Sequence, residues 1–174
     1  MTPLDFRPAI EADIDAIVVL VTRADRGDAS RAGWTTEADL LDGERIDAEV
    51  LRADIVRPRS RVVLALRDGA LLSCAHVADD GGAGYFGMFA VEPTCQGGGI
   101  GRTVVAECER ILRHDWQLPR VCMTVIEQRA ELIAWYERLG YRRTGGHKPF
   151  PYGDARFGAP RRDDLRFVVL EKTL

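Results

Sequence analysis

The sequence predicts a domain of the α/β class, α+β in the finer division, with a mixed and mostly antiparallel sheet of about seven strands flanked by helices. Hydrophobic patterns of helix type and of strand type alternate along the 174 residues, of which 46% are hydrophobic. Between residues 85 and 126, an apolar segment, a glycine-rich turn, a helical stripe and a second apolar segment follow one another. Such a β-α-β crossover makes its two strands parallel. We expect a single domain over residues 1–174.

The N-terminal part is predicted to contain a short strand near residues 4–7 and an amphipathic helix over residues 11–25. One face of this helix repeats with the i, i+3, i+4, i+7 spacing: Ile14, Ile17, Val18 and Val21. Residues 26–36 break the periodicity. Residues 40–56 contain enough helical spacing for one or two short helices.

The next apolar segments predict an antiparallel meander of three strands. Residues 61–67 and 70–79 flank the dipeptide Asp68-Gly69, which readily takes the positive φ angles of a tight hairpin turn. A glycine-rich turn then leads into the third strand, residues 85–92.

The C-terminal half continues with a helix from the glycines to about His114, whose apolar stripe consists of Ile100, Val104, Val105, Cys108, Ile111 and Leu112. Residues 120–126 are predicted to form a strand. A further helix is marked by Leu132, Trp135, Tyr136 and Leu139, and Gly140 follows it at the position where helices commonly end. A strand over 141–145, an irregular segment over 146–164 and a last strand over 165–172 complete the chain.

Composition excludes several classes of function. The net charge is −3, and no block of five or six like charges occurs, so we expect no nucleic-acid partner and no membrane partner. No signal peptide and no transmembrane run is found, which favours a cytoplasmic protein. The cysteines, without C-x-x-C spacing, are interpreted as thiols and not as disulfides or metal ligands: Cys74, Cys95, Cys108 and Cys122.

The stretch "QGGGIG", Gln96 to Gly101, lies where a strand gives way to a helix. The first N–H groups of a helix lack partners and attract anions, and Gly97, Gly98 and Gly99 let the backbone approach without a Cβ in the way. A phosphate or pyrophosphate suits such a turn. No Gly-Lys pair occurs, which excludes a P-loop, and Arg102 stands where a dinucleotide fingerprint needs glycine.

The remaining pattern, Q-x-x-G-x-G at Gln96, Gly99 and Gly101, resembles the acetyl-coenzyme A signature of the GNAT family of N-acetyltransferases. The segment "AWYERLGYRRTG" is similar to that family's second motif, a helix ending in Tyr-x-x-x-Gly-aromatic, and the order of elements is similar over nearly the whole chain. The resemblance implies the GNAT acyl-CoA N-acyltransferase fold, with the sheet splayed at the parallel pair. It also implies direct transfer of an acetyl group from acetyl-CoA to an amine of a small molecule, amino acid or peptide.

The resemblance assigns residues to the coenzyme. The pantetheine arm is expected along the strand edge at Phe89, Ala90 and Val91, with an N–H near Val91 stabilising the oxyanion. The pyrophosphate is expected on the backbone of Gln96, Gly97, Gly98, Gly99, Ile100, Gly101 and Arg102. Many members carry asparagine seven residues before the tyrosine, where this chain has Arg129, which leaves the local coenzyme contacts and the acyl selectivity open.

Tyr136 is the predicted catalytic acid, since a tyrosine keeps its proton at neutral pH; by periodicity alone it is a core residue. Glu127, at a strand end near the expected gap, is the candidate base, and a solvent-facing carboxylate is the alternative. His76, Glu92 and water remain open as bases. Cys95 has no nearby histidine and is disfavoured as a nucleophile.

Two long segments, 26–36 and 145–163, carry aromatic and charged residues and are candidates for acceptor contacts, surface loops or a homodimer contact. The arginines of the second segment are suited to a carboxylate-bearing acceptor: Arg156, Arg161 and Arg162. The alternative function is a regulatory or vestigial module that binds coenzyme A without turnover.

Overall fold

The computed structural model describes residues 1–174 and contains nine strands. Their bounds are β1 (Asp5–Pro8), β2 (Leu41–Asp42), β3 (Ser60–Arg67), β4 (Ala70–Asp79), β5 (Gly84–Val91), β6 (Arg120–Ile126), β7 (Arg142–Pro149), β8 (Ala159–Pro160) and β9 (Arg166–Thr173). Seven of them form one sheet in the order β1-β3-β4-β5-β6-β9-β7, and β2 pairs with β8. Only β5 and β6 are parallel; every other pair is antiparallel. The predicted mixed sheet and its parallel pair are confirmed.

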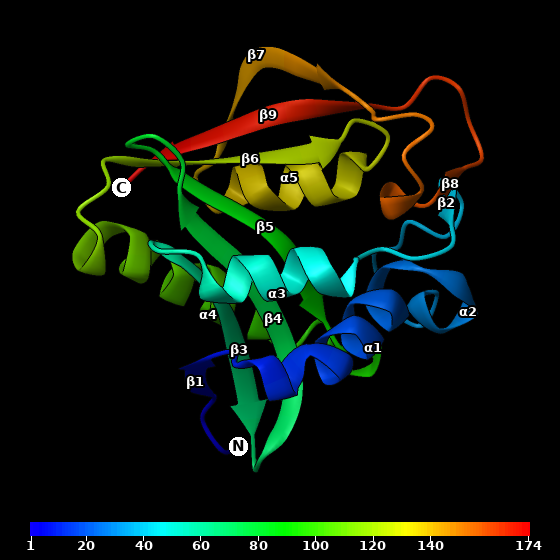
Figure 1. The fold of residues 1–174 in the computed structure, drawn as a ribbon. Coiled ribbons are helices and arrows are strands. Elements are labelled where there is room, and N and C mark those ends of the chain that lie inside the picture. The colour runs from blue at the N-terminus through cyan, green and yellow to red at the C-terminus, as the bar shows by residue number, and fades with distance from the viewer.

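Five α-helices flank the large sheet: α1 (Ile14–Asp25), α2 (Gly27–Ser30), α3 (Ala48–Val56), α4 (Ile100–Arg110) and α5 (Ala130–Arg138). A π-helical turn, Ile111–Asp115, extends α4. α1 and α3 cover one face of the sheet, whereas α4 and α5 pack on the other (Figure 1). None of the helices combines the length and the apolar character needed to cross a bilayer.

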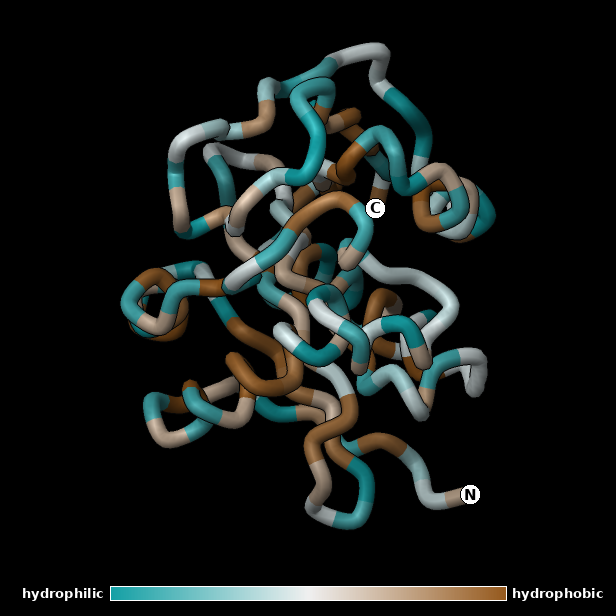
Figure 2. Tube along the Cα trace, turned by 90° about the vertical axis from the view of Figure 1, so that its right-hand side faces the viewer, coloured by the Kyte–Doolittle hydropathy of each residue, from teal (hydrophilic) through white to brown (hydrophobic).

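The period-2 geometry of strands divides the core into two layers. On β3, Val62 and Leu64 face the core under α1 and α3, while Val63 and Ala65 face the core under α4 and α5. Leu51 of α3 is fully buried, which is worth about 1.5–3 kcal/mol relative to exposure. The hydrophobic segments gather in the interior and the hydrophilic ones along the outer loops (Figure 2).

The sheet opens between its two halves. β5 and β6 pair only at Gly84 with Val121 and at Tyr85 with Cys122, and the strands then diverge (Figure 1). The register between β4 and β5 shifts near the same point, so that β5 carries one extra residue, and Met88 has φ = +48°. A β-bulge of this kind bends and twists its strand. It leaves the edge of β5 after Tyr85 without β6 as a partner.

Most predicted elements lie where the pattern placed them. The Asp68-Gly69 hairpin is confirmed, with φ of +52° and +79° and with Arg67 opposite Ala70. Segment 40–56, predicted to contain one or two short helices, contains one, α3, in its second half, and residues 41–42 form β2. The irregular segment predicted from residue 146 begins later, because β7 continues to Pro149 through its pairing with β9.

Candidate active site

The turn before α4 provides a cradle of open backbone. Gly99 caps the N-terminus of α4 with φ = +82°, and Gly97 has φ = +85°, left-handed conformations that glycine adopts without strain. A Cβ built on either residue would meet no atom within 4 Å. Because the N-terminus of a helix combines unpaired N–H groups with the positive end of the dipole, this turn fits a phosphate or pyrophosphate.

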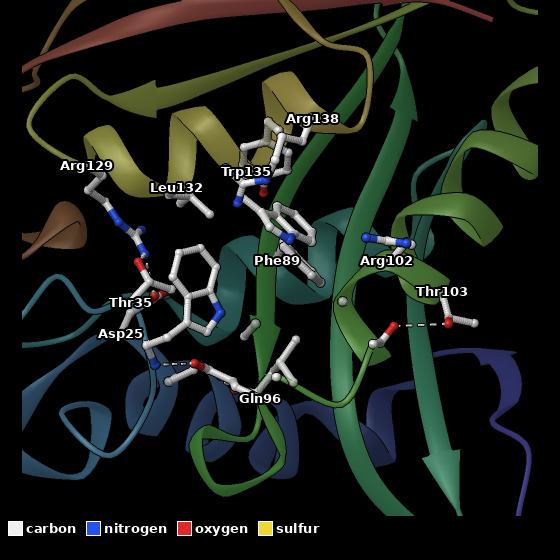
Figure 3. Close-up of a pocket in the computed structure, with 18 residues that line it drawn as sticks. Asp25, Thr35, Phe89, Gln96, Arg102, Thr103, Arg129, Leu132, Trp135 and Arg138 are labelled. Carbon is white, nitrogen blue, oxygen red and sulfur yellow. Dashed lines mark hydrogen bonds and ion pairs between the residues drawn. The ribbon is translucent and has the colours of Figure 1, made fainter.

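The side chain of Gln96 holds this turn in place through two hydrogen bonds. Its side-chain Oε1 accepts a hydrogen bond of 2.9 Å from the backbone N–H of Trp34, and its Nε2 donates one of 3.2 Å to the carbonyl oxygen of Val91 (Figure 3). The residue therefore joins the loop after α2 to the end of β5. The glutamine of the signature shapes the turn through its side chain.

The turn opens into a cavity of about 570 Å³, here named the α4 cleft (Figure 3). It is lined by the end of α1, the loop at residues 34–35, the end of β5, the start of α4 and one face of α5. Ten of the predicted site residues line it: Phe89, Ala90, Val91, Gln96, Gly97, Gly99, Gly101, Arg102, Arg129 and Tyr136. Three do not: Gly98 is exposed, Ile100 is buried in the core, and Glu127 lies elsewhere.

Aromatic rings form one wall of the α4 cleft. Phe89 and Trp135 stack with ring centroids 6.1 Å apart (Figure 3). The ring of Trp34 lies 6.3 Å from that of Trp135. Gly101 packs beneath this stack, since a Cβ there would lie 3.3 Å from Phe89. The pattern placed Trp135 on the apolar stripe of its helix but gave no sign that it and Trp34 meet.

Tyr136 packs in the hydrophobic core and also lines the α4 cleft. It is 4% exposed and packs edge-on against Trp135, Phe86 and Tyr141, so the periodicity that marked it as a core residue is confirmed. Its ring nevertheless lines the α4 cleft. Burial raises the pKa of its hydroxyl above the usual value of 10, and Tyr136 therefore stays protonated at neutral pH.

A narrow cavity of about 70 Å³ lies where β5 and β6 separate, and we name it the strand gap. Asp25, Arg129 and Tyr136 line both the strand gap and the α4 cleft. A third cavity of about 320 Å³, the α3 pocket, shares Glu37 and Arg45 with the strand gap. The strand gap therefore lies between the α4 cleft and the α3 pocket and shares lining residues with both.

Five charged side chains meet beside the strand gap. Arg26 and Arg129 bond to Glu37 at 3.0 and 2.7 Å. Arg129 also lies 3.7 Å from Asp25, and Arg45 lies 3.3 Å from Asp25 and 3.4 Å from Glu37. Arg129 thus extends from the start of α5 toward the end of α1 (Figure 3). Three cations face two carboxylates in this cluster.

The two carboxylates of the cluster differ in their proton affinity. Burial, followed by the charge of Glu37, raises the pKa of Asp25 to about 6. Burial also raises the pKa of Glu37, but the charges of Arg45, Arg129 and Arg26 outweigh it and the net shift is downward. Asp25 is therefore the group of the cluster that exchanges a proton near neutral pH.

Sequence reasoning missed Asp25, although one signal was present. It is the last residue of α1, and a carboxylate in the last turn of a helix opposes the helix dipole. Such a residue needs compensation from elsewhere, here Arg45 and Arg129. The sequence does not show these partners, which lie 20 and 104 residues away along the chain.

The other candidate bases have their own partners. Glu127 forms a paired hydrogen bond with Arg166, at 2.5 and 2.9 Å, and the Arg166 side chain lowers its pKa. His76 lies in the α3 pocket, where Nε2 is 2.8 Å from Ser60 Oγ and burial lowers its pKa. Glu92 pairs with Arg23 at 2.8 Å. Glu127 stays a prediction for the base, outside all three cavities.

Residues 24–141 match the family described as "Acetyltransferase (GNAT) family". The chain belongs to this family. This GNAT protein is 32% identical over 144 residues to the IAA acetyltransferase of Azospirillum brasilense, covering 80% of this chain and 84% of that protein. It is 36% identical over 66 residues to a mycothiol acetyltransferase of Salinispora tropica; this match covers 38% of this chain and only 22% of that protein.

Solved structures confirm the GNAT fold. The ribosomal-protein-alanine N-acetyltransferase of Brucella melitensis superimposes with a TM-score of 0.71 at 20% identity, covering 98% of this GNAT protein and 99% of that chain. The two sequence motifs, the splayed sheet and this structural match all indicate the GNAT fold. The structure contains no group of three or more His, Cys, Asp or Glu side chains arranged to hold a metal ion.

Proposed function

We propose that the protein is an N-acetyltransferase that transfers the acetyl group of acetyl-CoA directly to an amine. The arrangement of the three cavities carries this proposal: the α4 cleft fits the donor, the α3 pocket offers room for an acceptor, and the strand gap between them shares lining residues with both. Two substrates that enter from opposite sides meet in the gap, and holding them together supplies much of the rate enhancement.

The residues around the α4 cleft fit acetyl-CoA. The open turn at Gly97 and Gly99 suits its pyrophosphate, and Arg102 adds a positive charge at the same cleft. The edge of β5 from Phe89 to Val91 is free to pair with the pantetheine amides because β6 has left it. When bound there, acetyl-CoA supplies the thioester carbonyl that accepts the amine.

Proton transfer is assigned to two side chains at the strand gap. Asp25 faces the gap with a pKa of about 6, so at neutral pH it is ionised and accepts a proton from the acceptor amine. Tyr136 keeps its proton and donates it to the sulfur that leaves, since a thiol of pKa ~8.5 departs more readily when protonated. A backbone N–H near Val91 stabilises the oxyanion.

The test is thiol release from acetyl-CoA over a panel of amines. Tyr136→Phe and Asp25→Asn should each lower kcat by about 10²–10⁴-fold, the usual worth of a positioned acid or base. Glu127→Gln, which removes the alternative base, should retain activity. Tyr141→Phe is the matched control for the tyrosine, because its hydroxyl donates to Glu109 away from the gap.

The competing function is coenzyme binding without turnover. If the protein binds acetyl-CoA and no amine of the panel stimulates thiol release, the transferase proposal is wrong. If Glu127→Gln inactivates the enzyme and Asp25→Asn does not, the assignment of the base is wrong while the function stands.

A further inference from the structure

Resting on the proposed function, we propose that the acceptor is an α-amino acid with an apolar or aromatic side chain, whose carboxylate is bound by Arg45. Arg45 lines both the strand gap and the α3 pocket. Its side chain is 29% exposed, although its Nε is buried.

The charge cluster has one more positive side chain than negative side chains. Arg26, Arg45 and Arg129 face only Asp25 and Glu37. Partly buried charges are stabilised when they are paired and hydrogen-bonded. A carboxylate brought by the acceptor would balance the cluster.

Arg45 is the cation of the cluster that makes no side-chain hydrogen bond. Its Nε is buried and has no hydrogen-bond partner, although Asp25 and Glu37 lie 3.3 and 3.4 Å away. The Nε of Arg129 is also buried without a partner, but its two terminal nitrogens donate to Glu37 and Thr35. Arg26, in contrast, donates to Glu37 and to the backbone carbonyls of residues 42, 44 and 157. Both ion pairs of Arg45 use Nε, so no partner occupies its two terminal nitrogens, and these are the atoms with which arginine binds a carboxylate through two parallel hydrogen bonds.

The arginines of the loop before β9 are engaged by aspartates. Arg156 pairs with Asp154 at 2.6 Å, and Arg162 pairs with Asp164 at 2.7 Å. Arg161 pairs with Asp42, also at 2.7 Å. A carboxylate-bearing acceptor, which the sequence suggested for these three residues, is better served by Arg45.

The position of Arg45 next to Asp25 selects an α-amino group. In an α-amino acid one carbon atom separates the amine from the carboxylate, so a carboxylate bound by Arg45 holds the amine close to Asp25, whose Oδ2 lies 3.3 Å from Arg45 Nε. Asp25 takes the proton, the new N–C bond forms as the C–S bond breaks, and Tyr136 protonates the sulfur. An amine at the end of a long chain would lie too far from Asp25 when its carboxylate is on Arg45.

The walls of the α3 pocket fit an apolar side chain. The lining includes Ile46, Val50, Met88, Phe150, Phe157 and Phe167, and the rings of Phe150 and Phe167 lie 5.7 Å apart. The carboxylate of Asp47 is occupied by the N-terminus of α3, where it accepts from two backbone N–H groups. Asp54 lies 3.6 Å from His76 and disfavours an acidic side chain.

The experiment compares L-phenylalanine and L-methionine with phenethylamine and L-phenylalaninamide, which lack the carboxylate, and with spermidine. In the wild type, kcat/KM should be about 10- to 100-fold higher for the amino acids, the worth of a charge-assisted pair. Arg45→Met also raises the pKa of Asp25, because the charge of Arg45 lowers it, so turnover of every amine is expected to fall. The readout is therefore the ratio of kcat/KM for the amino acids to that for phenethylamine within each variant, which should drop to about one in Arg45→Met. Arg161→Met, an exposed arginine outside the cavities, is the control; thermal unfolding shows whether each variant is folded.

The outcomes separate this proposal from the function on which it rests. Preference for spermidine or phenethylamine over the amino acids in the wild type, or an amino-acid preference that persists unchanged in Arg45→Met, overturns the acceptor and leaves the transferase intact. If no amine releases thiol, the transferase proposal fails. Equilibrium dialysis of L-phenylalanine then decides on Arg45: binding that Arg45→Met abolishes supports it, and an absence of binding to the wild type refutes it.

Discussion

The buried carboxylate of Asp25 should make the stability of this protein fall as the pH rises. Its pKa is raised from 3.8 to about 6, first by burial and then by the charge of Glu37. Between these values the folded protein binds more protons than the unfolded chain, because Asp25 is protonated only when folded. The free energy of unfolding therefore decreases with increasing pH in this window.

The magnitude follows from the same two values. At about 1.4 kcal/mol for each tenfold change in proton affinity, the full shift is worth about 3 kcal/mol, of which about 2 kcal/mol is lost between pH 4 and pH 7. His76 acts with the opposite sign in an overlapping range, since burial lowers its pKa. Glu37 and Glu127, whose pKa values are lowered, also act with the opposite sign, so the wild-type curve alone mixes several groups.

The Asp25→Asn variant isolates the effect. At pH 4 the wild type already carries a neutral residue at this position, so the variant should fold with a comparable stability there. Glu37 stays ionised, because the net effect of its three arginines lowers its pKa. Urea unfolding of both proteins from pH 4 to pH 7, at constant ionic strength, gives the difference in unfolding free energy with the contribution of His76 cancelled.

We expect that difference to change by about 2 kcal/mol, with the wild type losing stability relative to the variant as the pH rises. Asp28→Asn, at a fully exposed side chain, controls for the introduction of an asparagine. Parallel curves for the wild type and Asp25→Asn across the whole range would refute the argument, since they would show that Asp25 has the same proton affinity in the folded and unfolded states.

Three further substitutions test the residues that hold the α4 cleft and the charge cluster in place. Gln96→Ala removes the two side-chain hydrogen bonds that hold the glycine turn. It should lower the free energy of unfolding in urea by about 1–3 kcal/mol and raise the KM for acetyl-CoA. Gly101→Ala places a Cβ 3.3 Å from Phe89 and should raise that KM in steady-state kinetics with little change in kcat. Arg129→Met removes a buried ion pair with Glu37 and should cost about 3 kcal/mol, the low end for such pairs, because two cations and two carboxylates remain; a cost below 1 kcal/mol would contradict this.

The fold was predictable where a local pattern carries the information. The hairpin at Asp68-Gly69 and the crossover from β5 to β6 follow from turn residues and from the change of hydrophobic period, and the structure confirms both. The strands β2 and β8 were not predictable. Each is two residues long, too short for a period to appear, and each exists through its partner more than 100 residues away.

The same division applies to the site. The glycine turn and Tyr136 belong to compact motifs, and the structure brings them to one cleft. Asp25 ends a helix whose pattern looks ordinary, and its significance arises from Arg45 and Arg129, which come from a loop and from the start of α5. A perturbed proton affinity is a property of the assembled cluster, and no short stretch of sequence contains it.

This difference explains why the donor was easier to infer than the acceptor. A pyrophosphate is held by the backbone of one helix N-terminus, so its signature must be contiguous in sequence. The α3 pocket is assembled from parts of the chain that are far apart, between residue 26 and residue 167, and its side chains can change one at a time without disturbing the fold. Arg45 illustrates the point: in the sequence it is one arginine among many, and its unused donors beside Asp25 become visible only when the strand gap is described.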